Sequence, residues 1–209
     1  MKVEIWSDVV CPWCYIGKRR FEKALEGFDE SVEVSWRSFE LDPVAPKEPA
    51  AALDEALASK YGMSLEQARA MMDQMTRTAA AEGLDFDFGR ARGGNTLDAH
   101  RLLHFAAEQG LQAEMKERLL RGYMTEGRAI SDPAELAELA SEVGLDPDEV
   151  TAMLAGDAYT DAVRRDEARA REIGVRGVPF FLIDERIGVS GAQPPELIRQ
   201  ALASALERD

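Results

Sequence analysis

The chain has 209 residues, of which 45% are hydrophobic and 31% are charged, a composition typical of a globular protein with an ordinary core. Its formal net charge of −14 disfavours binding to nucleic acid or to an anionic membrane surface. No apolar run approaches the roughly eighteen residues of a membrane-spanning helix. The alternating segment after Met1 and Lys2 differs from the long apolar stretch of a secretory signal. We therefore expect a cytoplasmic protein without a nucleic-acid or membrane partner.

The first predicted elements form a βαβ unit. Residues 2–6 alternate between apolar and polar side chains, which predicts a short strand. Apolar residues then recur at helical spacing, and Pro12 suits the first position of that helix, so Cys11 is predicted to be its N-cap. Alternation returns at residues 31–39 and predicts a second strand.

The middle of the chain predicts a separate helical domain. Residues 41–49 contain three prolines and indicate a crossing between domains. About five short helices should follow, since start and stop residues recur along the segment. The predicted starts are Ser64, Asn95, Asp132 and Asp146, and the predicted ends are Gly83, Gly110, Gly127 and Gly144. We expect this domain to span residues 43–155.

The C-terminal part returns to mixed structure. A charged helix is predicted at residues 157–173, a β-hairpin at residues 179–190 and an amphipathic helix at residues 196–206. The predicted apolar face of the last helix comprises Leu197, Ile198, Ala201, Leu202, Ala205 and Leu206. Residues 1–42 and 156–209 together therefore give βαβ, helix, β-hairpin and helix, which is the element order of a thioredoxin fold. The predicted fold class is α/β, a thioredoxin fold with a large all-helical insertion.

The two cysteines are the main chemical signal. Cys11 and Cys14 are separated by two residues, and such a pair is either a redox dithiol or half of a metal site. A sulfur at a helix N-cap lies near unpaired N–H groups and the positive end of the helix dipole, which favours its thiolate. We therefore expect Cys11 to attack substrate disulfides, with a pKa below that of a free thiol. Cys14, one turn later on the buried stripe, should be the resolving thiol.

A zinc site is the alternative interpretation of these cysteines. His100 and His104 complete a nominal Cys2His2 set with Cys11 and Cys14. Compact zinc modules hold their two halves about a dozen residues apart, whereas these halves are far apart in the chain. We interpret the histidines as ordinary interfacial residues and predict no metal.

Five sequence segments resemble the DsbA family of thioredoxin-like oxidoreductases, and most closely its FrnE-like branch. They are SDVVCPWCYIGK at residues 7–18, RSFEL at 37–41, NTLDAHRL at 95–102, GVPFF at 177–181 and SGAQ at 190–193. The resemblance implies that Cys11 attacks, that Cys14 resolves, and that Pro179 is a cis-proline facing them. It implies disulfide exchange with protein or peptide substrates, and no metal or nucleotide cofactor.

Three further residues are expected to bind substrate. Pro12 and Trp13 lie between the cysteines, and an aromatic side chain at a helix start should shape the surface that substrates meet. Val178 would present its backbone edge to an extended substrate segment by strand addition.

The sequence departs from its resemblance at one position of the first strand. DsbA proteins and thioredoxins tend to carry a buried acid six residues before the nucleophile, where this chain has Ile5. The group that accepts the proton of Cys14 is thus open, with Glu4, Asp8 and Glu40 as candidates.

A glutathione-dependent enzyme is the alternative function. The 2-hydroxychromene-2-carboxylate isomerases and kappa-class glutathione transferases resemble this chain in architecture. They carry serine at the position of Cys11, lack the second cysteine and use bound glutathione. The cysteine pair favours disulfide chemistry, with glutathione as a candidate partner.

Overall fold

The structure, a computed structural model, describes residues 1–48 and 52–207. Pro49, in the proline-rich crossing, lies outside these residues. The strands are β1 (Lys2–Ser7), β2 (Glu33–Ser38), β3 (Phe180–Ile183) and β4 (Ile187–Ser190). The helices are α1 (Pro12–Leu25), α2 (Leu53–Tyr61), α3 (Leu65–Ala81), α4 (Leu97–Glu108), α5 (Gln112–Arg121), the π-helix η1 (Gly122–Glu126), α6 (Pro133–Ser141), α7 (Pro147–Ala155), α8 (Thr160–Glu172) and α9 (Pro195–Leu206).

The four strands form one sheet in the order β2-β1-β3-β4. β1 runs parallel to β2, with Val3 opposite Val34, and antiparallel to β3, with Ile5 opposite Phe181. β3 and β4 form the predicted hairpin. The thioredoxin-like α/β fold predicted from the element order is confirmed.

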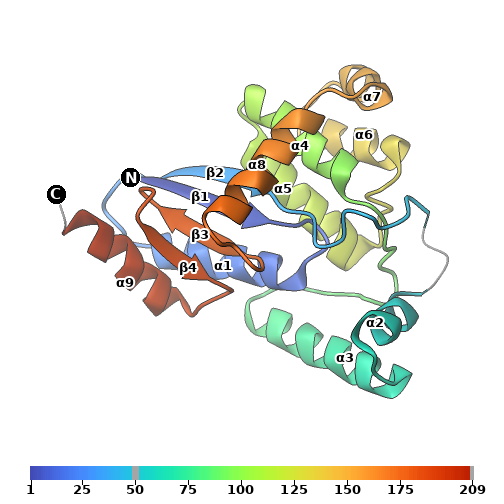
Figure 1. The fold of residues 1–209 in the computed structure, drawn as a ribbon, viewed down its shortest axis with the longest axis horizontal. Helices are drawn as coiled ribbons and strands as arrows, with labels where there is room; N and C mark the ends of the chain where they lie inside the picture. Colours follow the sequence, from blue (N-terminus) through green and yellow to red (C-terminus); the bar gives the residue numbers. More distant parts are fainter. Residues whose placement is uncertain (49–51, 208–209) are drawn as a thin grey trace.

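Helices cover both faces of the sheet (Figure 1). α1 and α9 lie on one face, where Val3, Ile5 and Phe181 pack into their apolar core. α8 crosses the other face, where Trp6 is completely buried and donates a hydrogen bond of 2.9 Å to the Asp166 backbone carbonyl. The central strand is thus covered on both sides, and its C-terminal end is held firmly.

The helix α1 is buried on two sides, which the single apolar stripe in the sequence did not predict. Phe21 and Ala24 face the sheet, whereas Tyr15 and Ile16 pack into the core of the helical segment. Lys18, on the charged face opposite the apolar stripe of the sequence, is nevertheless buried and pairs with Glu117 of α5 at 2.6 Å.

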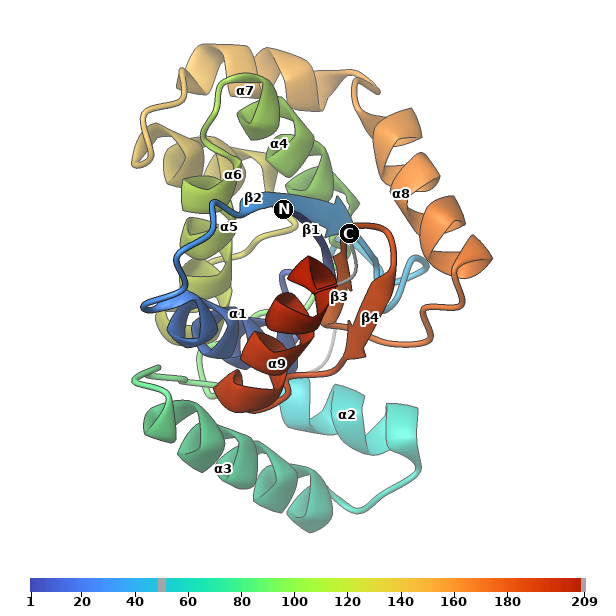
Figure 2. The same ribbon diagram turned by 90° about the vertical axis from the view of Figure 1, so that its left-hand side faces the viewer.

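The helical segment is divided by α1. Figure 2 shows α2 and α3 on one side of α1 and the group α4–α7 on the other. The core of this group includes Tyr15 and Ile16 of α1, so the helices do not have a core of their own. The division into residues 1–42 and 156–209 on one side and 43–155 on the other stays a prediction.

Most predicted helix boundaries agree with the structure. Ser64 forms a capping box with Gln67, and Asp132 and Asp146 cap α6 and α7. Two predictions were wrong. The N-cap of α4 is Thr96 rather than Asn95, whose side chain instead accepts a hydrogen bond from the Leu97 N–H. In α9, Leu197 and Leu206 are exposed because only its central residues reach the sheet.

Candidate active site

The cysteine pair lies where β1 leads into α1. The chain leaves the strand at Ser7, turns, and starts the helix with Cys11 as N-cap and Pro12 in its first turn, as predicted. Both cysteines are buried free thiols. The Cys11 side chain makes no capping hydrogen bond to the helix. Its sulfur lies instead 3.7 Å from the Val178 carbonyl oxygen, which is within hydrogen-bonding distance for a thiol.

The segment before β3 completes the site from the far end of the chain. The Val178–Pro179 peptide bond is cis, as the resemblance implied. Pro179 packs on the second turn of α1, so closely that a Cβ atom added to Gly17 would lie 2.7 Å from the Pro179 Cγ atom. The structure thus brings Cys11, Val178 and Pro179 together.

The two residues between the cysteines form the outer surface of this site. Trp13 is 42% exposed, and Pro12 is half-buried beside it. Because an exposed tryptophan leaves a large apolar area in water, this surface suits contact with another molecule. Substrate binding by Pro12, Trp13 and Val178 stays a prediction.

The two thiols titrate as one pair. The hydrogen bond with Cys14, and then burial, raise the pKa of Cys11 well above that of an ordinary thiol, and the Asp8 carboxylate adds to this effect. Burial also disfavours ionisation of Cys14, but the hydrogen bond from Cys11 and the charge of Lys116 outweigh it and lower the Cys14 pKa. The remaining proton of the ionised pair therefore rests on Cys11. The expectation that the helix start lowers the Cys11 pKa is wrong for this closed, reduced site, because the thiol faces a second sulfur and a carboxylate.

Asp8 is the candidate acid that lies beside the cysteines. Its carboxylate accepts hydrogen bonds of 2.7 Å from the Val9 and Leu41 backbone N–H groups and lies 3.2 Å from Nε2 of His100. Burial raises the Asp8 pKa, but the contact with His100 and the backbone donors outweigh it, so the net shift is downward. Asp8 therefore stays ionised and is poorly suited to accept a proton.

The other two candidate acids, Glu4 and Glu40, form ion pairs with arginines. Glu4 pairs with Arg37 at 2.6 Å and with Arg169 at 2.9 Å, on the face of the sheet that α8 covers. Glu40 pairs with Arg164 at 2.7 Å. Burial raises the pKa of Glu40, although His100 and Arg164 oppose this shift. Neither glutamate is among the groups that shift the pKa of either cysteine most strongly.

Lys116 of α5 is a site residue that sequence analysis missed. Its side chain is completely buried, and its Nζ atom donates a hydrogen bond of 3.3 Å to the Ser7 carbonyl oxygen. Burial lowers its pKa to about 8, although the negative charges of Cys14 and Asp8 oppose this shift. The sequence feature that could have identified Lys116 is its position between Met115 and Leu119, on the apolar stripe of a helix that should face the core.

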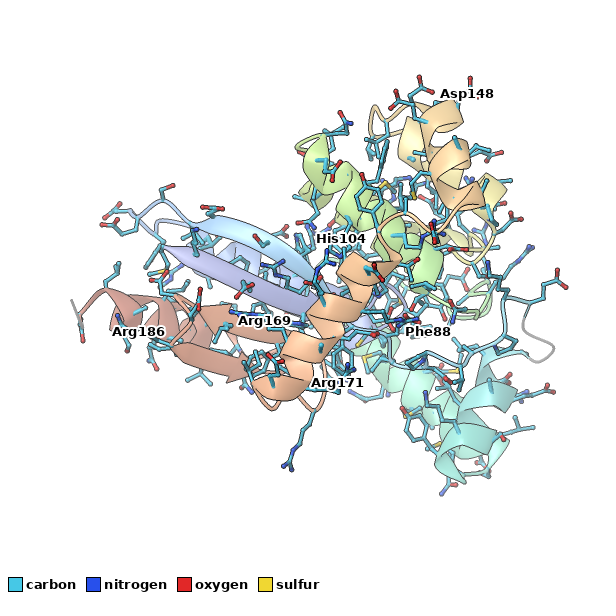
Figure 3. The ribbon with its side chains drawn as sticks, turned by 45° about the horizontal axis from the view of Figure 1, so that its top comes forward. Phe88, His104, Asp148, Arg169, Arg171 and Arg186 are labelled. Carbon is cyan, nitrogen blue, oxygen red and sulfur yellow. The ribbon has the colours of Figure 1, made fainter. Side chains whose placement is uncertain are left out.

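The histidines occupy different sites. His100 is completely buried beside Asp8, so it belongs to the wall of the cysteine site rather than to an ordinary interface. His104 lies on α4 next to α8 (Figure 3), with its Nε2 atom 3.1 Å from Asp166 and 3.2 Å from the Ser38 hydroxyl. Within the described residues, no group of three or more His, Cys, Asp or Glu side chains could hold a metal ion. The alternative zinc set is therefore not assembled.

A separate cleft lies between the α2–α3 hairpin and the loop that contains Phe88. It has a volume of about 1100 Å³, and none of the predicted site residues lines it. Among the described helices, none has the length and apolar character needed to cross a membrane.

Comparison with known proteins agrees with this geometry. Residues 2–203 match the family described as DSBA-like thioredoxin domain. The chain is 30% identical to the uncharacterized protein YwbO of Bacillus subtilis, covering 96% of this chain and 95% of that protein. A crystal structure of a probable DsbA oxidoreductase from Streptomyces coelicolor is 48% identical, with a TM-score of 0.95 over 100% of this chain and 91% of that chain.

Two more distant structures share the fold. The cytosolic disulfide reductase DsbM of Pseudomonas aeruginosa, solved with GSH, is 22% identical, with a TM-score of 0.69 over 99% of this chain and 100% of its own. A 2-hydroxychromene-2-carboxylate isomerase is 16% identical, with a TM-score of 0.76 over 100% and 97% of the two chains.

Proposed function

The chain belongs to the DSBA-like thioredoxin domain family, whose members act on disulfides, and we propose that it is a cytoplasmic dithiol-disulfide oxidoreductase working through Cys11 and Cys14. One observation carries the proposal. Two hydrogen-bonded thiols lie at the start of α1, and the outer one faces the Val178 carbonyl oxygen at 3.7 Å. A pair that shares one proton holds a thiolate, which is the reactive form in disulfide exchange.

The first step is attack on the substrate disulfide. The proton that Cys11 shares with Cys14 moves along the hydrogen bond to Cys14 and leaves a thiolate on Cys11. This thiolate forms a new S–S bond with one substrate sulfur, and the substrate's own S–S bond breaks. The other substrate sulfur leaves as a thiolate and takes up a proton from solvent.

The second step releases the substrate. Cys14 loses its proton and its sulfur attacks Cys11, which forms the Cys11–Cys14 disulfide and breaks the bond between Cys11 and the substrate. The substrate sulfur leaves as a thiolate and takes up one proton, which balances the proton that Cys14 loses. The substrate gains two electrons in total, and the cysteine pair loses two. The reverse sequence oxidises a substrate dithiol.

The proposed substrates are disulfides of proteins or peptides. An extended peptide can pair with the backbone of Val178 as an added strand, while Trp13 offers an apolar surface beside the sulfur. Glutathione is the proposed small thiol that exchanges with the pair, and the GSH complex of DsbM supports testing it.

The experiment compares two single variants. Cys14→Ser should accumulate a mixed disulfide with a model peptide, because no second thiol can resolve it, whereas Cys11→Ser should form no adduct. Mass spectrometry after a non-reducing quench detects the adduct. An adduct through Cys14 in the Cys11→Ser protein would reverse the two roles.

A parallel assay addresses the glutathione-dependent alternative. Wild type should reduce insulin disulfides in the presence of dithiothreitol, and both serine variants should lose this activity. Glutathione conjugation or isomerisation of an aromatic substrate that survives in Cys11→Ser would instead favour the alternative. Fractionation of the source cells tests the cytoplasmic location.

A further inference from the structure

A lysine without a carboxylate partner lies under the cysteine pair. Lys116 is 0% exposed, and among the described residues no carboxylate forms an ion pair with it. Its Nζ atom donates a hydrogen bond to the Ser7 carbonyl oxygen and lies 5.5 Å from the Trp36 ring centre. Burying an ammonium group with so little compensation disfavours folding, so a nearby negative charge is required to offset it.

Lys18 is a second buried lysine, and carboxylates compensate its positive charge. Its side chain is 8% exposed, and its Nζ atom pairs with Glu22 at 2.5 Å and with Glu117 at 2.6 Å. Lys116 has no comparable partner in the described part of the chain. The difference points to a compensating charge other than a carboxylate in direct contact.

The groups that act on Lys116 by charge identify this partner. Cys14, Asp8 and Cys11 favour its ammonium form, in that order, and Lys18 opposes it. Asp8 already has His100 and two backbone N–H groups as partners. The Cys14 thiolate is therefore the strongest anionic partner of Lys116.

Ser7 joins the lysine to the sulfur. Its hydroxyl group hydrogen-bonds to Cys14, and its carbonyl oxygen accepts the hydrogen bond from Lys116. Because Ser7 is the last residue of β1 and is completely buried, it fixes both groups relative to the sheet. The ammonium group and the thiolate are held in a site without solvent, where a charge interaction is strong.

We propose that Lys116 is a positioning residue whose buried positive charge stabilises the Cys14 thiolate and thereby sets the redox equilibrium of the cysteine pair. This inference rests on the proposed function. In the dithiol state, Lys116 faces a thiolate. In the disulfide state, Cys14 carries no charge and Lys116 loses its main partner. The lysine thus favours the reduced protein and supports the thiolate that attacks Cys11 in the second step.

The test is the thiol-disulfide equilibrium with glutathione in Lys116→Met, a variant of similar shape without the charge. We expect the equilibrium to shift at least tenfold towards the Cys11–Cys14 disulfide, which corresponds to about 30 mV for a two-electron couple. Lys18→Met is the matched control, since that lysine is also buried but has two carboxylate partners. It should stay within threefold of wild type.

Stability separates a redox role from a merely structural one. Lys116→Met should lower the unfolding temperature of the dithiol form relative to the disulfide form, because only the dithiol form has the thiolate partner. Equal losses in both forms, or an equilibrium within threefold of wild type, would overturn the inference. Because Lys116 loses its proton near pH 8, the difference between variant and wild type should shrink above that pH. Among the groups around Lys116, Cys14 and Asp8 have lowered pKa values, Cys11 has a raised pKa, and Lys18 adds a positive charge.

A measurement on the wild type covers the case in which the variant does not fold. Nuclear magnetic resonance of the Lys116 amine should give a higher pKa in the dithiol form than in the disulfide form. Equal pKa values in the two forms would contradict the inference. If wild type forms no Cys11–Cys14 disulfide in any glutathione buffer, the proposed function fails instead, so the two failures are distinguishable.

Discussion

Oδ1 of Asp8 lies 3.2 Å from Nε2 of His100, and solvent reaches 1% of the Asp8 side chain and 0% of the His100 side chain. This contact joins the turn after β1 to the first part of α4. It places a negative charge close to the cysteines, where it raises the pKa of Cys11. The turn that carries the dithiol is therefore fixed from the helical segment.

Asp8→Asn should affect both stability and the thiol. The amide cannot accept all of the hydrogen bonds from backbone N–H groups and His100, so we expect a loss of about 1–3 kcal/mol in unfolding free energy. Removing the charge should also lower the pKa of Cys11. Thiolate absorbance in a Cys14→Ser background measures this pKa for Cys11 alone. Asp73→Asn, at an exposed position in α3, is the control, and an unchanged Cys11 titration in Asp8→Asn would contradict the prediction.

The contact between α1 and α5 should make stability depend on pH. Glu117 accepts a hydrogen bond of 2.6 Å from the Tyr15 hydroxyl, pairs with Lys18 at 2.6 Å and also pairs with Arg19. Burial raises the Glu117 pKa, but these partners outweigh it and lower the pKa to about 2. Because the unfolded chain binds this proton at higher pH, the carboxylate stabilises the fold above about pH 4.5 and this contribution is lost as pH falls towards 2.

Glu117→Gln tests this pH dependence. We expect lower stability than wild type at neutral pH and a smaller further loss between about pH 5 and pH 2. Urea unfolding at several pH values measures both effects. Glu114→Gln, at an exposed position of the same helix, should keep the acid dependence of wild type. Parallel curves for Glu117→Gln and wild type would show that the pairs contribute nothing.

Arg101 should be essential for the connection between α7 and α8. Its guanidinium is 4% exposed and pairs with Asp98 of α4 at 2.8 Å. It also donates to the backbone carbonyl oxygens of Met153, Leu154, Gly156 and Ala158. Arg101→Met leaves these buried acceptors unpaired and leaves the Asp98 carboxylate with Lys47 as its remaining ion-pair partner, so we expect a loss of about 3–5 kcal/mol.

The control for Arg101 is a surface arginine. Arg69 is 66% exposed and pairs with Asp54, and Arg69→Met should cost less than about 1 kcal/mol. Chemical denaturation measures both variants. Since Arg101 does not touch the cysteines, the glutathione equilibrium of the folded variant should equal that of wild type, and a similar small loss in both variants would refute the prediction.

Local patterns predicted the parts of the site that are close in sequence. Cys11 and Pro12 have the positional preferences of a helix start, and the strand before them alternates, so the position of the dithiol followed from about a dozen residues. The hairpin after Pro179 was also predictable, because its two strands are close in sequence. The order of these elements then indicated the thioredoxin fold.

Local sequence patterns did not predict the contacts between distant segments. Lys116 meets Ser7 from 109 positions away, and His100 meets Asp8 from 92 positions away. Local periodicity does not predict which strand a buried polar side chain will contact. The prediction of a lowered Cys11 pKa was wrong for the same reason. A helix start favours a thiolate, but a carboxylate and a second sulfur from other parts of the site oppose this effect.

The last prediction concerns the packing of α1 against the segment before β3. Gly17 lies where Pro179 approaches the helix, and a Cβ atom at this position would be 2.7 Å from the Pro179 Cγ atom and 3.5 Å from the Ala192 Cβ atom. The first distance is far shorter than a normal contact between carbon atoms. Pro179 is a ring in a buried segment and cannot rotate away, so Gly17→Ala must displace the backbone.

We expect Gly17→Ala to destabilise the protein by about 1–3 kcal/mol, in spite of the higher helix propensity of alanine. The displaced segment carries the Val178 carbonyl oxygen away from Cys11, so insulin reduction should also slow. Gly156→Ala is the control, because its added Cβ atom would meet only the Met153 carbonyl oxygen at 3.9 Å. Denaturant unfolding and the insulin assay, run on both variants, measure the two effects. If Gly17→Ala is as stable and active as wild type, the close approach of Pro179 to α1 does not hold Val178 in place, and the site must be fixed by other contacts.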